Sequence, residues 1–219
     1  MRMRKKKNLV PRMERCAPVH VRDGFSLKGK WRETLMPEAK EVRVELGCGK
    51  GRFTVETARQ HPDTLFIAIE KVPDAMVIAM ERAMAQELKN VFFVVGDAAL
   101  LPDYFAQDEV ALIYINFCDP WPPKGQAKRR LTHRGFLETY RKVLRMGGQV
   151  EFKTDNQPLF EFSVLEFPAA GYELSEVTRN LHEHGPQGVM TDYEAKFYDQ
   201  GLPINRCVGT KMERTAPEE

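Results

Sequence analysis

Short apolar runs and longer segments of helical periodicity alternate along the chain between residues 42 and 167. Apolar runs predict strands at 42–46, 65–69, 91–95, 110–115 and 150–153. Between and after them, apolar residues spaced for one helix face predict helices at 53–60, 75–88, 136–144 and 159–167. Because the strands are apolar on both faces and alternate with helices, we predict an α/β fold with a mostly parallel, doubly wound sheet.

Both ends of the chain are less regular. Residues 1–25 mix basic residues with Pro11 and Pro18 and show little periodicity, and 31–35 predicts a short helical turn. Two further strands are expected at 173–177 and 202–212, the last of them antiparallel. The length of 219 residues suits one sizeable domain. We therefore expect a basic, flexible arm over 1–25 and a single domain over 26–219.

Acidic residues stand at or just after the end of each of the five central strands. They are Glu45, Glu70, Asp97, Asp119 and Asp155. In open parallel sheets, ligands bind outside the carboxyl ends of the strands. The sequence thus predicts a ligand site at this edge, lined by carboxylates.

The turn after the first strand has the pattern G-x-G-x-G, in which Gly47 and Gly49 allow close approach of a ligand. Glu70 is placed to accept hydrogen bonds from both ribose hydroxyls of an adenosine. Asp97 can face an adenine amino group and the Ala98 N–H a ring nitrogen, although Asp97 also suits a helix N-cap. These residues leave NAD and S-adenosylmethionine both open, but the turn lacks the dehydrogenase spacing G-x-G-x-x-G.

The fourth strand runs into Asp119-Pro120-Trp121-Pro122. Proline restricts the backbone, and tryptophan can stack on a planar base. We interpret this run as a stiff, aromatic and acidic wall beside the cofactor site. A purely structural proline-rich loop is the alternative.

From about Val44 to the last strand, the chain resembles the bacterial tRNA (guanine-N7-)-methyltransferase family of the TrmB type. The motifs that carry the resemblance are VELGCGKG (44–51), AIEK (68–71), GDA (96–98), the run 117–122, KRRL (128–131), FKTDN (152–156) and TDYEAKF (191–197). Many methyltransferases share the glycine turn, whereas the DPWP loop and the downstream motifs are far more specific.

The resemblance implies a Rossmann-like methyltransferase domain that moves a methyl group from S-adenosylmethionine to N7 of a guanosine in the variable loop of tRNA. Expected cofactor-binding residues are Glu45, Gly47, Gly49, Glu70, Asp97, Ala98 and Asp119, with Asp119 also at the reaction centre. Expected substrate-binding residues are Lys124, Asp155, Thr191, Asp192, Tyr193 and Glu194.

One departure affects Lys124. The family usually has lysine directly after D-P-W-P, where this chain has Pro123. The family's next basic positions are here Gly125 and Gln126. Either Lys124 replaces the family lysine by a loop shift, or that contact is missing. The departure keeps an alternative open: an RNA-binding protein with this fold and reduced catalysis. An NAD-dependent dehydrogenase explains the glycine turn and Glu70 but not the other motifs.

Basic residues are clustered, although the formal net charge is only +2. One cluster is Arg2, Arg4, Lys5, Lys6 and Lys7, and the other is Lys124, Lys128, Arg129 and Arg130. Both can contact RNA phosphates, or can be a solvated tail and a solvated helix face.

Metal, disulfide and membrane functions are not indicated. The four cysteines are widely spaced without metal-ligand spacing, which suits a reducing cytoplasm. No apolar run reaches membrane length. His182 and His184 are interpreted as loop residues, and Thr191 with Glu194 fits a capping box. The sequence leaves a monomer or a homodimer open.

Overall fold

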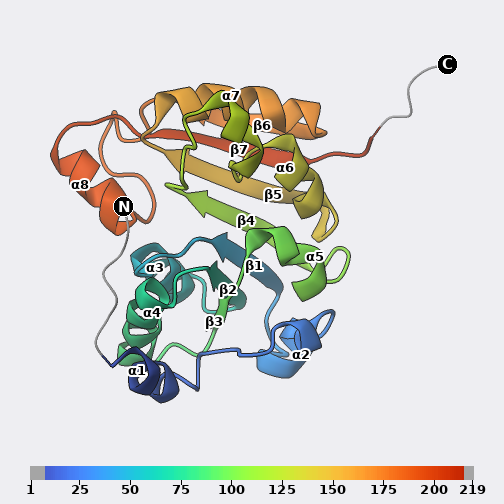
Figure 1. The fold of residues 1–219 in the computed structure, drawn as a ribbon, viewed down its shortest axis with the longest axis vertical. Helices are drawn as coiled ribbons and strands as arrows, with labels where there is room; N and C mark the ends of the chain where they lie inside the picture. The colour runs from blue at the N-terminus through green and yellow to red at the C-terminus, as the bar shows by residue number, and fades with distance from the viewer. Residues whose placement is uncertain (1–7, 215–219) are drawn as a thin grey trace.

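The computed structural model describes residues 8–214, apart from the side chain of Lys124. A single seven-stranded sheet has the order β3-β2-β1-β4-β5-β7-β6 (Figure 1). The strands are β1 (Glu41–Leu46), β2 (Thr64–Glu70), β3 (Val91–Val95), β4 (Val110–Asn116), β5 (Leu144–Thr154), β6 (Tyr172–Thr178) and β7 (Asn205–Lys211). Strands β1 to β5 pair in parallel, and β7 lies antiparallel between β5 and β6. This confirms the predicted mostly parallel sheet with an antiparallel last strand.

Helices cover both faces of the sheet. The helices α2 (Trp31–Leu35), α5 (Leu101–Tyr104), α6 (Arg134–Arg141) and α7 (Gln157–Ala169) contribute to one apolar core. On the other face, α1 (Leu9–Arg15), α3 (Arg52–Gln60) and α4 (Pro73–Ala85) form a second core. Helix α8 (Asp192–Asp199) belongs to neither of these two layers and lies at the edge of the sheet to which the β4 arrow points in Figure 1.

Alternation along the strands decides which side chains face α3 and α4. In β4, Ile113 and Ile115 belong to the first core and Tyr114 to the second. Because side chains alternate, Asn116 shares the face of Tyr114, and Lys153 lies opposite its neighbour Phe152, a first-core residue. Polar groups thus enter the α3 side of the sheet near its carboxyl edge.

Residues 8–25 are more ordered than the sequence predicted. Helix α1 packs on α4, where the Arg12 guanidinium donates to Glu81 at 2.7 Å. After it, the chain bridges to β3 through Val21 N–H to Phe93 O at 2.9 Å. The prediction of an irregular segment is wrong here because these long-range contacts leave no local periodicity. The basic residues of 1–7 lie outside the described residues, and the division into arm and domain stays a prediction.

The helix predicted over 136–144 ends earlier, at Arg141, and β5 begins at Leu144. A glycine pair is typical of a helix end, but Gly147 and Gly148 lie inside β5. Gly147 has φ +69°, and the β4–β5 register shifts between Val110 and Leu112. The glycines accommodate an irregularity in the strand, which a one-dimensional pattern cannot distinguish from a helix terminus.

Candidate active site

The carboxyl ends of the parallel strands meet at one edge, as predicted. In register, Leu46 pairs with Ile69 on one side and with Ile115 on the other. Farther along, Asn116 pairs with Lys153. The segments that follow these strands therefore lie next to one another and can form one site.

Two glycines of the turn face open space, and a third is packed against α4. Gly47 and Gly49 have φ +80° and +54°, and a Cβ atom at either would meet nothing within 4 Å. At Gly51, with φ +76°, a Cβ atom would overlap that of Ala79 in α4 and lie 2.8 Å from its Cα. Gly47 and Gly49 therefore leave room for a ligand, while Gly51 lets α4 approach the turn.

Substitution of Gly51 by alanine should lower the free energy of unfolding by about 2–4 kcal/mol, since overlap with α4 adds to the cost of the left-handed backbone. Urea unfolding followed by circular dichroism measures this. Gly49→Ala is the matched control, because only backbone strain of about 1 kcal/mol applies there. Equal losses in the two variants would contradict this division.

Glu70, at the end of β2, fastens the turn. One carboxylate oxygen accepts from Gly49 N–H and the other from Val72 N–H, both at 2.9 Å. The side chain is only partly buried, and a carboxylate has about four acceptor sites, so it can accept further hydrogen bonds. Glu70 can therefore hold the turn and a diol ligand together.

Asp97 follows β3 and caps the short helix η2 (Ala98–Leu100), accepting from Ala99 N–H at 3.0 Å. Its other oxygen pairs with Lys71 at 2.7 Å. Burial acts to raise the pKa of Asp97, but this hydrogen bond and Lys71 outweigh it and hold the pKa below its ordinary value. The N-cap interpretation is thus confirmed, and Asp97 stays ionised and partly accessible.

Exposed apolar side chains stand beside these two acids. Val72 is 40% exposed, Val95 39% and Leu100 39%. They follow or end β2 and β3, next to Glu70 and Asp97 in the chain. Apolar flanks for a planar base and acids for a ribose and an amino group fit an adenosine-containing cofactor.

Glu45 lies beneath the turn rather than on its open face. It is 3% exposed and accepts hydrogen bonds from Thr54 and Asn116. Burial raises the pKa of Glu45 above its ordinary value, against these two hydrogen bonds. The cofactor contact expected for Glu45 stays a prediction; its observed role is to tie β1 to α3 and β4.

The loop after β4 is held in an unusual shape. Phe117 and Trp121 both have positive φ, at +53° and +43°. The Arg130 side chain donates to Pro120 O at 2.9 Å and to Trp121 O at 3.1 Å. The Arg129 guanidinium lies 3.5 Å from the centroid of the Trp121 ring. Arg129 and Arg130 of the basic cluster therefore stabilise the conformation of this loop.

Asp119 sits on this loop with an exposed side chain. Beside it, burial raises the pKa of the Cys118 thiol to about 12, so it stays protonated at neutral pH. A protonated thiol is a poor nucleophile. Cys118 is therefore no candidate nucleophile at neutral pH, and the placement of Asp119 at the reaction centre stays a prediction.

The predicted substrate residues differ in exposure. Asp155 and Tyr193 are exposed, whereas Asp192 pairs with Arg82 of α4 at 2.9 Å. The capping box of α8 is confirmed: Thr191 accepts from Glu194 N–H, and Glu194 accepts from Thr191 N–H. Glu194 has no exposed surface, so a substrate contact would require it to leave its partners. The Lys124 side chain lies outside the described part of the chain.

The sequence did not predict that Lys153 and His182 contact Glu194. Lys153 pairs with Glu194 at 2.7 Å, and His182 Nε2 lies 3.1 Å from the same carboxylate. The available signal for Lys153 was a charged residue in a strand that the predicted α/β fold covers with helices on both faces. Among residues 8–214, no group of three His, Cys, Asp or Glu side chains could hold a metal ion.

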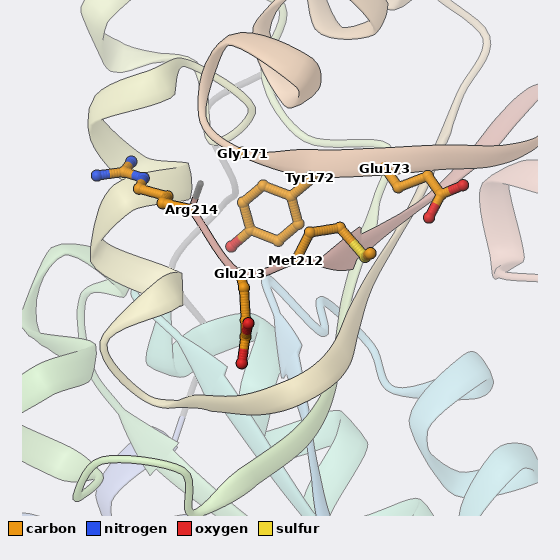
Figure 2. Close-up of a pocket in the computed structure, with 6 residues that line it drawn as sticks. All are labelled: Gly171, Tyr172, Glu173, Met212, Glu213 and Arg214. Atoms are coloured by element: carbon orange, nitrogen blue, oxygen red, sulfur yellow. The ribbon is translucent and has the colours of Figure 1, made fainter. Parts of the chain in front are cut away.

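One surface hollow lies away from the predicted site. This hollow of about 490 Å³ is open and is lined by Gly171, Tyr172, Glu173, Met212, Glu213 and Arg214 (Figure 2). It lies where β6 begins and β7 ends, at the sheet edge opposite the predicted site. In the described range, no helix is both long and apolar enough to span a bilayer.

The doubly wound sheet with its antiparallel β7, the open glycine turn and the acids after β2 and β3 fit a Rossmann-like, S-adenosylmethionine-dependent methyltransferase, and the comparisons with known proteins identify this class. A family model described as "Putative methyltransferase" matches residues 39–207. The solved structure of the 16S rRNA methyltransferase KamB has the same fold, with a TM-score of 0.64 at 18% identity over 83% of this chain and 92% of that one.

Curated relatives show to which methyltransferase family the chain belongs. The tRNA (guanine-N(7)-)-methyltransferase of Clostridioides difficile (strain 630) is 42% identical over 96% of this chain and 99% of its own. That of Geobacillus kaustophilus (strain HTA426) is 39% identical over 98% and 99%. The chain belongs to the bacterial tRNA (guanine-N(7)-)-methyltransferase family, which confirms the resemblance and sets the dehydrogenase alternative aside.

Proposed function

We propose that this chain transfers a methyl group from S-adenosylmethionine to N7 of a guanosine in the variable loop of tRNA. The observation that carries the proposal is Asp119, exposed on the loop that follows β4 and that Arg130 holds in place; β4 pairs with β1, which leads into the open glycine turn. The relatives named above are tRNA (guanine-N(7)-)-methyltransferases by name, which supports the reaction and leaves the variable loop as part of the proposal.

The cofactor's place follows from the turn and its neighbours. Glu70 would hold the ribose, and Asp97 with Ala98 N–H would hold the adenine between the exposed apolar side chains. Gly47 and Gly49 leave open space for the methionine part of S-adenosylmethionine. When bound, S-adenosylmethionine supplies an electrophilic methyl group on a sulfonium.

The acceptor atom needs orientation more than proton removal. Guanine N7 has a lone pair and no proton, so no general base is required to expose it. The protein has to hold the base in line for attack. Positive charge develops on the purine as the bond forms, and a fixed carboxylate can stabilise it. We assign that electrostatic and orienting role to Asp119.

Selection of guanine would come from hydrogen bonds that adenine cannot make. Guanine presents an N1–H and an exocyclic amine, whereas adenine has no N1–H. The exposed carboxylates Asp119 and Asp155 can accept from these groups. Asp192 and Tyr193, at the start of α8, supply further substrate contacts in this proposal.

The base has to leave any stack to reach the site. Lys128 and Arg129 are exposed for phosphate contact, whereas Arg130 is half-buried and engaged with the loop. We propose that Lys124 takes the place of the family lysine displaced by Pro123. The four cysteines are free, and we place the protein in a reducing cytoplasm.

Incubation with methyl-labelled S-adenosylmethionine and unmodified tRNA tests the proposal. We expect label in the tRNA and chain cleavage by aniline at one guanosine of the variable loop, because 7-methylguanosine makes the chain labile. Label without cleavage would assign another acceptor atom. Absence of label would favour the alternative of an RNA-binding protein with reduced catalysis.

Removal of residues 1–7 should weaken tRNA binding and flatten its salt dependence, since five basic residues are lost. Each lost phosphate contact reduces the slope of log K against log salt by about 0.7–0.9. Filter binding at several salt concentrations measures the slope. An unchanged slope would exclude this segment from RNA binding.

A further inference from the structure

A buried ion pair joins β5 to α8. Lys153 is 2% exposed and Glu194 0%, and their charged groups are 2.7 Å apart. Lys153 also donates to Val189 O at 3.0 Å, and its ammonium lies 4.9 Å from the centroid of the Phe53 ring. The lysine is therefore fully engaged by the segment before α8 and by α3.

His182 completes the environment of Glu194. Gln187 N–H donates to His182 Nδ1 at 3.1 Å, so Nδ1 is the acceptor and Nε2 carries the hydrogen. That hydrogen points to the second oxygen of Glu194, at 3.1 Å. The carboxylate thus receives hydrogen bonds from Lys153, His182 and the Thr191 backbone.

Such a pair is a costly way to stabilise a fold. Charges lose hydration on burial, and well-packed apolar residues often hold the same place with equal or greater stability. What the pair provides is a defined position of α8 relative to β5. Lys153 stands two residues before Asp155, and Glu194 follows Asp192 and Tyr193. One ion pair therefore fixes two segments that the proposed function assigns to the substrate.

Two further contacts relate α8 to the rest of the site. Arg82 donates both to Asp192, at 2.9 Å, and to the carbonyl of Lys50 in the glycine turn, at 3.0 Å. Phe197 stacks on Phe117, which precedes the Asp119 loop, with ring centroids 6.2 Å apart. A displaced α8 would thus disturb the acceptor side, while β1, β2 and β3 would still hold the donor side.

We propose that Lys153 and His182 are positioning residues for methyl transfer. They hold Glu194, and through it they hold α8 and the loop after β5 in the relative position that the target base requires. This inference rests on the proposed function and deepens it.

His182→Leu removes one donor and leaves the ion pair in place, so the protein should fold. We expect kcat/KM for tRNA to fall at least about tenfold, the effect of one hydrogen bond to a charged group. The dissociation constant for S-adenosylmethionine, measured by calorimetry, should stay within twofold. His182→Gln keeps a donor nitrogen at similar reach and should recover most of the loss. His184→Leu, two residues away and exposed, is the matched control and should behave as the unaltered enzyme.

Hydrogen exchange supplies a second readout. In His182→Leu, amides of α8 should exchange at least about tenfold faster, while those of α3 and α4 keep their rates. Unchanged tRNA kinetics in His182→Leu, or an equal loss in S-adenosylmethionine affinity, would overturn the inference. If the unaltered enzyme itself fails to methylate tRNA, the proposed function fails instead, so the two failures are distinguishable.

Discussion

Asp119→Ala should lower kcat for tRNA methylation at least about a hundredfold, the usual effect of losing one preorganised electrostatic contact. The side chain is exposed on a loop that Arg130 fastens to the carboxyl edge of β4. The backbone of the loop that carries this charge is therefore held in place before the base arrives. Asp119→Asn should lose nearly as much, because the amide keeps the shape but not the charge. Single-turnover rates with saturating S-adenosylmethionine measure the effect.

Asp103→Ala is the matched control for this substitution, since it removes an exposed aspartate on α5. Its turnover should remain within about twofold of the unaltered enzyme. Near-normal single-turnover rates in Asp119→Ala would remove Asp119 from the reaction centre. A loss in Asp119→Ala with full activity in Asp119→Asn would mean that shape and hydrogen bonding matter and charge does not.

Glu70→Ala should weaken S-adenosylmethionine binding at least about thirtyfold. Hydrogen bonds to a charged group contribute about 1.5–3 kcal/mol each, and a ribose diol can donate two. The substitution also releases Gly49 N–H and Val72 N–H, which loosens the turn that bounds the cofactor's place. Calorimetric titration with S-adenosylmethionine measures the dissociation constant.

Glu38→Ala, an exposed glutamate, is the control and should leave the constant unchanged. Glu70→Gln separates the two roles of Glu70. If the carboxylate only fastens the backbone turn, glutamine should restore part of the affinity, since its oxygen still accepts one of the two N–H groups. An unchanged dissociation constant in Glu70→Ala would contradict the assignment of Glu70 to the cofactor.

The central strands could be predicted because their burial on both faces imposes continuous apolar runs. The register then brought the acids after these strands together, as the topology of a parallel sheet requires. Helix α1 could not be predicted, since it depends on Arg12 meeting Glu81, 69 residues away. The start of β5 could not be predicted, because the sequence pattern does not distinguish a glycine at a strand irregularity, as Gly147 is, from a glycine at a helix end.

Within the site, the sequence identified the acids but not which way each one faces. Glu45 is covered by α3 and Asn116, and Glu194 by Lys153 and His182, which are 41 and 12 residues from it. Burial of a carboxylate depends on what packs over it, and strand-end position carries no information about that. Asp119, Asp155 and Glu70 follow the simple expectation because the described structure leaves them partly or fully exposed.

The acceptor atom is the central claim, and a tRNA transcript made with 7-deazaguanosine tests it most directly. The substitution replaces N7 by a C–H group and leaves the Watson–Crick edge intact. Filter binding first establishes that both transcripts bind the enzyme equally. We predict label from S-adenosylmethionine in the ordinary transcript and none in the substituted one. Equal labelling of the two transcripts would contradict methyl transfer to guanine N7.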